Sequence, residues 1–499
     1  MAVVGAGISG VCAAAYLLKY DLEVKVFERA SVAGGAWHFD PRVSDDPTFP
    51  SEAPSVGDYV RSLAGQFSDA GDDILVAETE TNGTTHPLHT ADEAALSVSF
   101  SPPGPCYAGL TNNVPTHLMV SALAPWPTGT PPNTTQDVIE QYVQALAASH
   151  GAHAVTEYDT RVDEISKAPG QEAWAVRTLR LRGGRVEEQT RRFDAVVVAS
   201  GHYNLPRVPG IPGLKDWKAL FPAQVIHAKQ YRTPETFRGR NVLLIGAGTS
   251  ALDICRESEG IANKLYQSTR GGQFDIPAVM MPPSVERVGE VERFHVPSER
   301  TITSPDLPGH NAPSAGEVIF RDGTVLKDIH HIVVATGYIT SYPFLPQFHS
   351  DTVLAHEAGP ELLVTAEGNM VHNLHKDIFF IDDPTLSFVG VPYHTATFSL
   401  FDFQAQVVAR VLAGRAILPS TEAMRDEYQR RVRDEGLGRG FHSLKMAGRE
   451  IEYVKELVDW VNRDAARLGI PPMLGHAKSW IDEYWALREK WKALFSTSK

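Results

Sequence analysis

The hydrophobic pattern of the first thirty residues changes from strand-like to helix-like and back. A short apolar run at residues 2–4 precedes a glycine-rich turn, a helical pattern and a second strand, Val24-Lys25-Val26-Phe27-Glu28. A similar apolar strand and glycine-rich turn recur at residues 242–251. This order is typical of a dinucleotide-binding unit, so the pattern predicts two such units in one chain.

The remaining pattern predicts further strands and helices around these two units. Residues 136–150 place their apolar positions on one helical face, and residues 173–198 read as strands with Gly183-Gly184 as a turn. Two apolar strands end in similar turns, Ala199-Ser200-Gly201 and Ala335-Thr336-Gly337, on either side of the second unit. We interpret these turns as the crossings into and out of an inserted domain.

The predicted fold is therefore α/β, with two Rossmann-like dinucleotide-binding domains. The first is discontinuous, residues 1–210 and 331–430, and residues 211–330 are inserted as the second. Residues 431–499 are predicted to form a helical C-terminal extension. Its apolar stripe is interpreted as packing on the body of the protein, with a homodimer contact as the alternative. The stripe consists of Trp480, Tyr484, Leu487, Trp491, Leu494 and Phe495.

Composition and charge argue against several classes of function. The 499 residues carry a net charge of -14 without a dense Lys/Arg block, which argues against a nucleic-acid partner. No uncharged apolar run reaches the roughly 18 residues of a membrane helix, and we expect no signal peptide ahead of the first strand. The cysteines Cys12, Cys106 and Cys255 form no C-x-x-C motif, as is usual in a reducing compartment. We therefore expect a cytoplasmic protein without a membrane partner. No metal-ligand spacing is found, so no metal is expected.

The first glycine-rich turn has the residues that a pyrophosphate site requires. Gly5 permits the tight turn, Gly7 lets the backbone approach the phosphates, and Gly10 lets the helix pack on the strand. Glu28, at the end of the next strand, can accept hydrogen bonds from ribose hydroxyls. Because its carboxylate would repel a 2′-phosphate, this unit is predicted to bind FAD or NAD and not NADP.

The second unit differs at the corresponding strand end. Its turn and first helical residues include Gly246, Gly248 and Ser250, with Ala251 in place of the third glycine. The next strand ends in Ser268-Thr269-Arg270 and lacks an acidic residue. Guanidinium and hydroxyl donors suit a dianionic 2′-phosphate, so this unit is predicted to bind NADPH. A flavin and a nicotinamide in one chain make electron transfer from NADPH to FAD the expected chemistry.

A stretch between the two units resembles a known fingerprint. Residues 221–231, Phe-Pro-Ala-Gln-Val-Ile-His-Ala-Lys-Gln-Tyr, are similar to the F-x-G-x-x-x-H-x-x-x-(Y/F) motif of class B flavin-containing monooxygenases, with Ala223 where glycine is usual. Other similar segments contain Gly35 and Trp37 (G-G-x-W), Gly201-His202-Tyr203, Ser268-Thr269-Arg270, Thr336 and Gly337 (A-T-G-Y), and Gln404. The resemblance spans roughly residues 2–415 and is greatest to the fungal and yeast-type soluble members.

The resemblance implies a reaction and a set of binding residues. NADPH would reduce FAD, dioxygen would form a C4a-hydroperoxide on the reduced flavin, and a soft nitrogen or sulfur of a small molecule would be oxygenated. It implies that Gly35, Trp37, Thr336, Gly337 and Gln404 contact a cofactor. His227, inside the fingerprint, is expected to link the domains by a hydrogen bond and not to act as a base.

The family's asparagine beside the flavin corresponds to one of two neighbouring residues. The segment is Leu110-Thr111-Asn112-Asn113-Val114-Pro115, and the family pattern is T-N-x-P. Alignment on Pro115 selects Asn113 as the catalytic residue, whereas alignment on Thr111 selects Asn112. We expect Asn113 to hold this role.

Three other functions remain open. A Baeyer–Villiger ketone monooxygenase is disfavoured by Tyr231, where those enzymes typically have tryptophan. A flavin disulfide reductase is disfavoured by the absence of a C-x-x-C pair. A non-catalytic redox sensor would bind both cofactors without turnover, and the intact glycines and Asn113 argue against it. Residues 41–110 are the least readable part of the chain, and the substrate is not identified.

Overall fold

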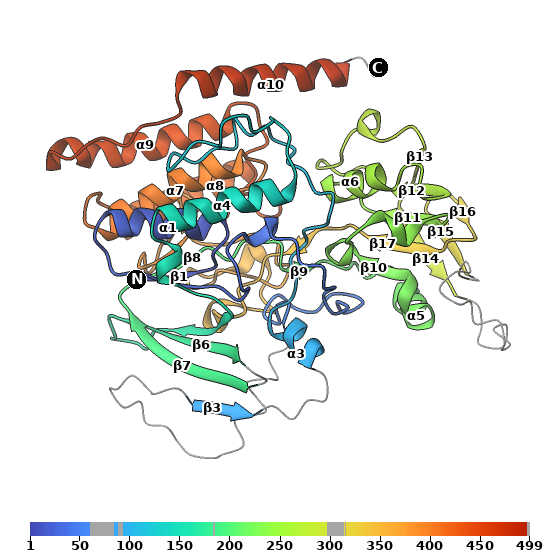
Figure 1. The fold of residues 1–499 in the computed structure, drawn as a ribbon, viewed down its shortest axis with the longest axis horizontal. Coiled ribbons are helices and arrows are strands. Elements are labelled where there is room, and N and C mark those ends of the chain that lie inside the picture. Colours follow the sequence, from blue (N-terminus) through green and yellow to red (C-terminus); the bar gives the residue numbers. More distant parts are fainter. Residues whose placement is uncertain (60–83, 88–92, 183–184, 297–313, 315, 497–499) are drawn as a thin grey trace.

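The computed structural model describes residues 1–59, 84–87, 93–182, 185–296, 314 and 316–496. Two separate, mainly parallel sheets, each with helices against it, occupy the two halves of the molecule in Figure 1. Helices of the C-terminal extension lie over one of these halves. The arrangement agrees with the predicted α/β fold with two Rossmann-like domains and a helical extension.

The larger sheet contains the first glycine-rich unit. Its strand order is β19-β20-β21-β8-β1-β2-β4, parallel from β21 to β4 and antiparallel at the β19 edge. The strands are β1 (Ala2–Val4), β2 (Lys25–Phe27), β4 (Thr156–Glu157), β8 (Val196–Val198), β19 (Leu374–His375), β20 (Phe379–Phe380) and β21 (Leu386–Phe388). The all-apolar strands β1 and β8 are buried because layers cover both faces of the sheet.

Three helices cover one face of this sheet. They are α1 (Ile8–Lys19), α4 (Gln136–Ser149) and α7 (Thr397–Leu412). Helix α1 is almost entirely buried, since its small residues let α7 pack closely against it. Helix α4 buries Ile139, Tyr142, Val143 and Leu146, which confirms the helix predicted at residues 136–150. The core of this domain therefore lies between the sheet and these helices.

A second, antiparallel sheet lies on the other side of the first domain (Figure 1). Its order is β3-β7-β6-β5, with α3 (Glu93–Phe100) nearby. The strands are β3 (Thr84–Pro87), β5 (Thr160–Ser166), β6 (Trp174–Arg182) and β7 (Arg185–Phe193). The predicted strands at residues 173–198 are confirmed, and the Gly183-Gly184 turn lies outside the described residues.

The inserted domain is built on a five-stranded parallel sheet of order β10-β17-β11-β12-β13. The strands are β10 (Val225–His227), β11 (Asn241–Ile245), β12 (Lys264–Ser268), β13 (Val285–Val288) and β17 (His331–Val334), with helices α5 (Leu214–Leu220) and α6 (Thr249–Ser258). A small antiparallel sheet joins β14 (Val291–His295), β15 (Glu317–Phe320) and β16 (Val325–Leu326). Because β17 pairs with β10 and β11, the domain boundary predicted at residue 331 falls one strand too early.

The two chain crossings between the domains lie side by side. Strand β9 (Leu205–Pro206) follows the first crossing turn, and β18 (Tyr338–Ile339) follows the second. They pair antiparallel, Tyr338 with Pro206 and Ile339 with Leu205. Backbone hydrogen bonds therefore tie the two connections into one short ribbon.

The C-terminal extension is helical, as predicted. It contains α8 (Thr421–Glu435), which begins in the last part of the predicted first domain, α9 (Arg449–Leu468) and α10 (Lys478–Ser496). Trp480 and Tyr484 of α10 are buried against Leu118 and Ala396, and Trp480 Nε1 donates to Leu118 O at 2.9 Å. The packing interpretation of the stripe is thus confirmed for these two residues. The side chains of Leu494 and Phe495 lie outside the described part of the chain.

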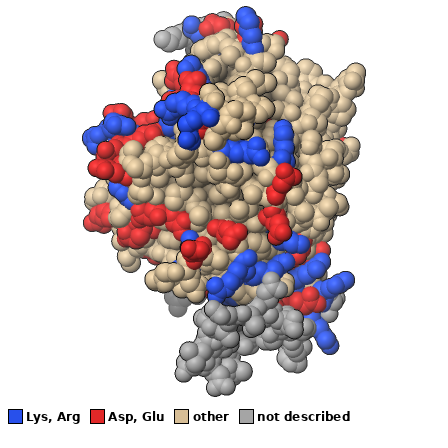
Figure 2. Space-filling model, turned by 90° about the vertical axis from the view of Figure 1, so that its left-hand side faces the viewer, with Lys and Arg blue, Asp and Glu red and all other residues tan. Residues whose placement is uncertain are grey.

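The face of the molecule drawn in Figure 2 carries charges of both signs. Figure 2 shows Lys and Arg side chains interspersed with Asp and Glu on one face, without a continuous basic surface there. Among the described helices, none combines the length and the apolar character needed to cross a membrane.

Candidate functional site: a cavity shared by two glycine-rich turns

A continuous cavity of about 3440 Å³ runs between the two parallel sheets. Both glycine-rich turns line it, as do the two crossings and the Asn112-Asn113 segment. Typical sites for one small ligand are roughly 300–1,000 Å³, so this cavity has room for more than one large ligand.

The first turn brings two glycine segments into contact. Gly5 has φ +98°, and a Cβ there would lie 2.8 Å from Ala199 O. A Cβ on Gly35 would lie 2.8 Å from the Cα of Gly7, and a Cβ on Gly10 would lie 1.8 Å from Gly5 O. Glycine at these positions therefore permits close backbone packing around the turn at the N-terminus of α1, where unpaired N–H groups and the helix dipole favour a pyrophosphate. The arrangement fits the bound group that the sequence predicts.

Glu28 stands beside this turn, directly after β2. Its Oε2 accepts a hydrogen bond from Ala6 N at 2.6 Å, and its Oε1 accepts from Ala30 N at 2.8 Å. Burial raises the pKa of Glu28, and the two N–H donors oppose that rise. The carboxylate fixes the turn and still lines the cavity, where its remaining lone pairs are available to ribose hydroxyls.

Trp37 and Gln404 occupy different positions relative to the cavity. Trp37 lines it and packs edge-on against Phe398 with ring centroids 6.5 Å apart. Gln404 is fully buried: its Oε1 accepts from Gly390 N, and its Nε2 donates to Tyr453 Oη. The direct cofactor contact predicted for Gln404 is therefore not supported by its position. Gln404 instead holds Gly390, which does line the cavity.

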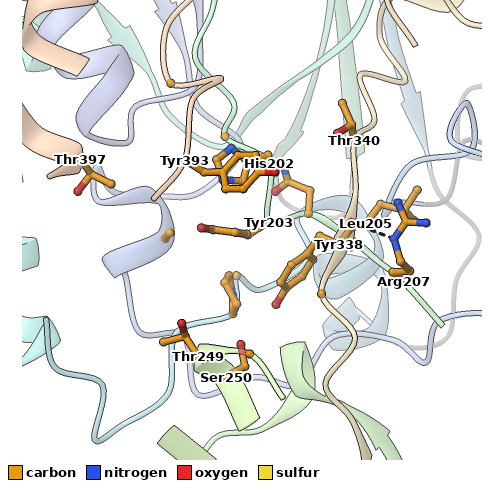
Figure 3. Close-up of a pocket in the computed structure, with 18 of the residues that line it drawn as sticks. His202, Tyr203, Leu205, Arg207, Thr249, Ser250, Tyr338, Thr340, Tyr393 and Thr397 are labelled. Atoms are coloured by element: carbon orange, nitrogen blue, oxygen red, sulfur yellow. Dashed lines mark hydrogen bonds between the residues drawn. The ribbon is translucent and has the colours of Figure 1, made fainter. Parts of the chain in front are cut away.

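The second turn leaves an open cradle. A Cβ on Gly246 (φ +125°) would lie 2.3 Å from Ala335 O, so this position requires glycine. A Cβ on Gly248 would meet nothing within 4 Å, so there is space for the phosphates of a ligand at the start of α6. Thr249 and Ser250 are exposed to the cavity in the first turn of that helix (Figure 3). This geometry fits a second dinucleotide.

Of the three predicted 2′-phosphate donors, Ser268 and Thr269 use their side chains within the protein, whereas Arg270 has no side-chain partner among the described residues. Ser268 is buried, and its hydroxyl donates to Gly289 O at 2.8 Å. The Thr269 hydroxyl donates to Asp275. Arg270 is exposed, lines the cavity and has no side-chain hydrogen bond or ion pair among the described residues. Ser268 and Thr269 therefore shape the loop, because their donors are already used, and Arg270 is the available cation.

The second crossing is held by the residues predicted there. The Thr336 hydroxyl donates to Arg207 O, and Arg207 N donates to Gly337 O at 2.9 Å. Thr336 and Gly337 both line the cavity. Their backbone thus forms part of the wall where the two domains meet.

His227 links the fingerprint to this crossing. Its Nδ1 accepts a hydrogen bond from Lys229 N at 3.1 Å, so its Nε2 carries the proton and donates to Gly337 O at 3.1 Å. Burial lowers the pKa of His227 to about 3, and the imidazole is neutral at physiological pH. The predicted linking role of His227 is confirmed.

The two candidate asparagines face different surroundings. Asn112 is buried, and its side chain donates to Val114 O and Pro132 O and accepts from Thr134 N at 2.6 Å. Asn113 is exposed to the cavity, and no hydrogen bond of its side chain is found among the described residues. The Asn112 amide is therefore occupied by the fold, whereas the Asn113 amide is available to a ligand.

Aromatic side chains at the crossings were quoted in the sequence motifs but given no role. Tyr203 and Tyr338 extend into the cavity with ring centroids 5.3 Å apart, between Tyr393 on one side and Ser250 on the other (Figure 3). His202 packs edge-on against Tyr203 at 4.3 Å. In the sequence, the aromatic residues that follow the two crossing turns, Tyr203 and Tyr338, could have indicated this aromatic wall of the cavity.

A buried ion network was also missed by sequence reasoning. Lys229 Nζ lies 2.8 Å from Asp58 Oδ2, and Arg29 binds both oxygens of Asp58. Burial alone would raise the pKa of Asp58, but the Arg29 and Lys229 cations lower it below its usual range. No sequence motif reveals this pairing because the partners are far apart in the chain.

Cys12, Cys106 and Cys255 are all free and buried. Where the structure describes the chain, no three His, Cys, Asp or Glu side chains are grouped as a metal site would need.

Comparisons with known proteins define the family. The flavin-binding monooxygenase-like family model matches residues 104–282 and 313–471, and an NAD(P)-binding Rossmann-like model matches residues 3–54. The chain is 39% identical over 515 residues to the flavin-containing monooxygenase ustF2 of Aspergillus flavus, covering 99% of this chain and 98% of the relative.

Solved structures have the same fold. S-allyl-L-cysteine S-oxygenase from Allium sativum superposes with a TM-score of 0.67 and 22% identity, over 98% of this chain and 92% of that one. A cyclohexanone monooxygenase superposes with a TM-score of 0.54 and 13% identity, over 95% and 99%.

Fold, cavity and comparisons together define a two-dinucleotide flavoenzyme. The chain belongs to the flavin-binding monooxygenase-like family. It is a flavin monooxygenase, and its cofactors are FAD and NADPH.

Proposed function

We propose that this enzyme uses NADPH and dioxygen to oxygenate a soft nitrogen or sulfur atom of a small molecule. The observation that carries the proposal is the free amide of Asn113 in the shared cavity, next to an Asn112 whose amide is fully used by the fold. The name of the solved S-allyl-L-cysteine S-oxygenase supports the same class of reaction.

Each domain has a separate task in this proposal. FAD is held by the domain formed from residues 1–210 and 335 to about 430. Its binding residues are Gly5, Gly7, Gly10, Glu28, Gly35 and Trp37. NADPH is held by the inserted domain, residues 211–334. Its binding residues are Gly246, Gly248, Ser250 and Arg270. FAD, when bound, supplies the electron transfer and the reaction with dioxygen.

The protein's own residues place the reactants and exclude water. The neutral amide of Asn113 both donates and accepts hydrogen bonds, so it can orient a bound group without moving a proton. Its loop is fixed to the NADPH domain because Tyr107 Oη donates to Asp253 Oδ2 at 3.0 Å and Ala108 N donates to Arg232 O at 3.0 Å. Tyr203 and Tyr338 narrow the cavity between the two turns. Exclusion of water protects a reactive flavin from unproductive decay.

Tyr231 is one of the residues that hold the Asn113 loop in place. Its ring packs edge-on against Tyr107 at 5.5 Å, and its hydroxyl donates to Glu257 at 2.7 Å. The residue that closes the fingerprint therefore helps to position the Asn113 loop.

A substrate panel tests the proposal. Purified holoenzyme is incubated with NADPH and matched small amines, sulfides and cyclic ketones, and oxygenated product is measured against NADPH consumed. Product from amines or sulfides with little hydrogen peroxide supports the proposal. Product only from ketones would assign Baeyer–Villiger chemistry instead, and peroxide without product would favour a reductase or sensor.

A further inference from the structure

Among the arginines that line the cavity, Arg207, Arg270 and Arg439 come from separate segments and lie near one another. Arg207 follows β9, Arg270 follows β12, and Arg439 lies in the loop between α8 and α9 of the C-terminal extension. Arg439 reaches the second crossing, since a Cβ on Gly337 would lie 3.0 Å from its Nη2. The predicted cofactor motifs contain Arg270 but give no role to Arg439.

The loop that carries Arg439 contacts the loop that begins at Arg270. Lys445 Nζ donates to Gln273 O at 3.1 Å and lies over the Phe274 ring, 5.6 Å from its centroid. A Cβ on Gly440 would lie 3.6 Å from the Gln273 side chain. The C-terminal extension therefore meets the inserted domain beside the end of β12.

Buried anchors hold the Arg439 loop in place. The Phe441 side chain is 1% exposed, and Arg431 donates to Phe441 O. His442 Nδ1 lies 2.8 Å from Asp377 Oδ1 in the buried interior. Because its neighbours are fixed on the C-terminal side, Arg439 is presented to the cavity by an ordered segment.

No ion pair joins Arg207, Arg270 or Arg439 to an acidic side chain in the part of the chain that the structure describes. Arg207 Nη2 donates hydrogen bonds to three acceptors within the protein: Glu367 O, Gly368 O and Asn369 Oδ1. Neither Arg270 nor Arg439 forms an ion pair or a side-chain hydrogen bond among the described residues. Burial, and then the neighbouring Arg439 and Arg270, lowers the pKa of Arg207 to about 10. Like charges gathered without a partner destabilise a fold, unless an anion binds between them.

We propose that Arg439 joins Arg270 in binding the 2′-phosphate of NADPH, so that the C-terminal extension sets the preference for NADPH over NADH. This inference rests on the proposed NADPH-dependent reaction and deepens it. A dianion at the end of β12 suits two guanidinium groups, each of which can donate two parallel hydrogen bonds. The Ser268 and Thr269 hydroxyls are already engaged, and Arg439 supplies the donors that they do not.

Binding of NADP⁺ and NAD⁺ to the FAD-loaded enzyme tests the proposal without turnover. Titration calorimetry compares the wild type with Arg439→Ala, Arg439→Lys, Arg270→Ala and the control Arg433→Ala. Arg433 lies on α8, is exposed and does not line the cavity. FAD content and melting temperature establish that each variant is folded.

The expected result is a selective loss. Arg439→Ala should weaken NADP⁺ binding roughly ten- to a hundredfold, the value of one charged hydrogen-bonded contact, and leave NAD⁺ binding unchanged. Arg439→Lys should lie between Ala and wild type, and Arg433→Ala should match wild type. Equal effects on NADP⁺ and NAD⁺, or no effect on either, would overturn the proposal.

A third pattern separates the phosphate from an anionic substrate. Unchanged NADP⁺ binding together with a raised KM only for substrates that carry a carboxylate would place the anion on the substrate and overturn the cofactor assignment. The NADP⁺ to NAD⁺ ratio remains measurable if no amine or sulfide is oxygenated. Failure of the proposed reaction is therefore distinguishable from failure of this inference.

Discussion

Lys229 and Asp58 form a buried ion pair, with 2.8 Å between Nζ and Oδ2, that joins the inserted domain to the FAD-binding domain. Arg29 binds the same carboxylate through two nitrogens, at 2.9 and 3.0 Å. Lys229 also donates to Asn204 O in the first crossing. One carboxylate is therefore shared by two cations, the buried Lys229 and the half-buried Arg29, at the place where the chain passes between domains.

Replacing that carboxylate should destabilise the fold strongly. Asp58→Asn leaves the Lys229 and Arg29 cations uncompensated, at a cost of about 3–5 kcal/mol in the free energy of unfolding. Urea unfolding of the holoenzyme measures it. Asp459→Asn is the matched control, because Asp459 pairs with Lys455 on an exposed helix face, where solvent screens the pair and it contributes little to stability. Equal effects of the two substitutions would contradict the structural role of Asp58.

The same pair predicts a pH dependence on the acid side. The folded pKa of Asp58 lies below its ordinary value of 3.8, so its stabilisation is complete above that value. It is lost as the pH falls from that value through the folded pKa, because the unfolded chain binds the proton at a higher pH than the folded protein does. In Asp58→Asn this acid-side loss should be smaller than in the wild type. Melting temperatures of both proteins from pH 6 down to pH 2 provide the check.

Glu450 predicts a pH dependence of opposite sign. It is buried beside Ala396 N, which donates to both of its oxygens at 3.0 and 3.1 Å. Burial raises the pKa of Glu450 from 4.5 to about 7, so the folded state holds the proton more tightly than the unfolded chain. Stability should fall as the pH rises from about 4.5 to 7, by roughly 3 kcal/mol in total.

Glu450→Gln should remove this slope while keeping an acceptor for Ala396 N. The melting temperature of the wild type is expected to fall relative to the variant between pH 5 and pH 8. Glu452→Gln, on an exposed position of the same helix turn, should keep the wild-type slope. A parallel course for wild type and Glu450→Gln would show that Glu450 is ionised throughout.

Gly35 should be required for FAD retention. Its φ is +57°, and a Cβ would lie 2.8 Å from the Cα of Gly7 in the pyrophosphate turn. Gly35→Ala should therefore lower the FAD to protein ratio of the purified enzyme, measured by absorbance. Gly260→Ala is the control, because Gly260 has φ +73° but nothing within 4 Å of a Cβ. It carries the backbone cost of roughly 1–2 kcal/mol without the clash. Full FAD content in Gly35→Ala would argue against this pyrophosphate site.

Asn112 and Asn113 should give opposite phenotypes. Asn113→Ala should keep its stability and FAD but release hydrogen peroxide, with product formation lowered roughly a hundredfold, as for the loss of one preorganised donor. Asn112→Ala removes three hydrogen bonds and should cost about 1–3 kcal/mol of stability. Product per NADPH and the melting temperature separate the two. Full coupling in Asn113→Ala would refute its catalytic assignment.

The sequence predicted those features that depend on neighbouring residues. The glycine turns, helix α4 and the two crossings follow from local pattern and spacing, and the structure has them. The boundary at residue 331 was misplaced because β17 is a short apolar strand that either sheet could accept, and only its pairing with β11 decides.

The hydrogen-bond partners of individual side chains were harder to predict from the sequence. Ser268 and Gln404 fit the motif positions, yet their polar atoms are used by Gly289 and Gly390. Arg439 and Asp58 lie outside every motif, and their positions depend on contacts with residues far away in the chain. Local patterns determine the backbone turns here, whereas tertiary packing determines which polar atoms remain available to a ligand.

Rapid mixing of NADPH-reduced enzyme with aerated buffer tests the central claim most directly. We expect a delayed return of oxidised-flavin absorbance, accelerated by amines or sulfides, with oxygenated product formed in proportion to the NADPH consumed. Acceleration by ketones alone, or immediate reoxidation with peroxide release, would contradict the proposed oxygenation of nitrogen or sulfur.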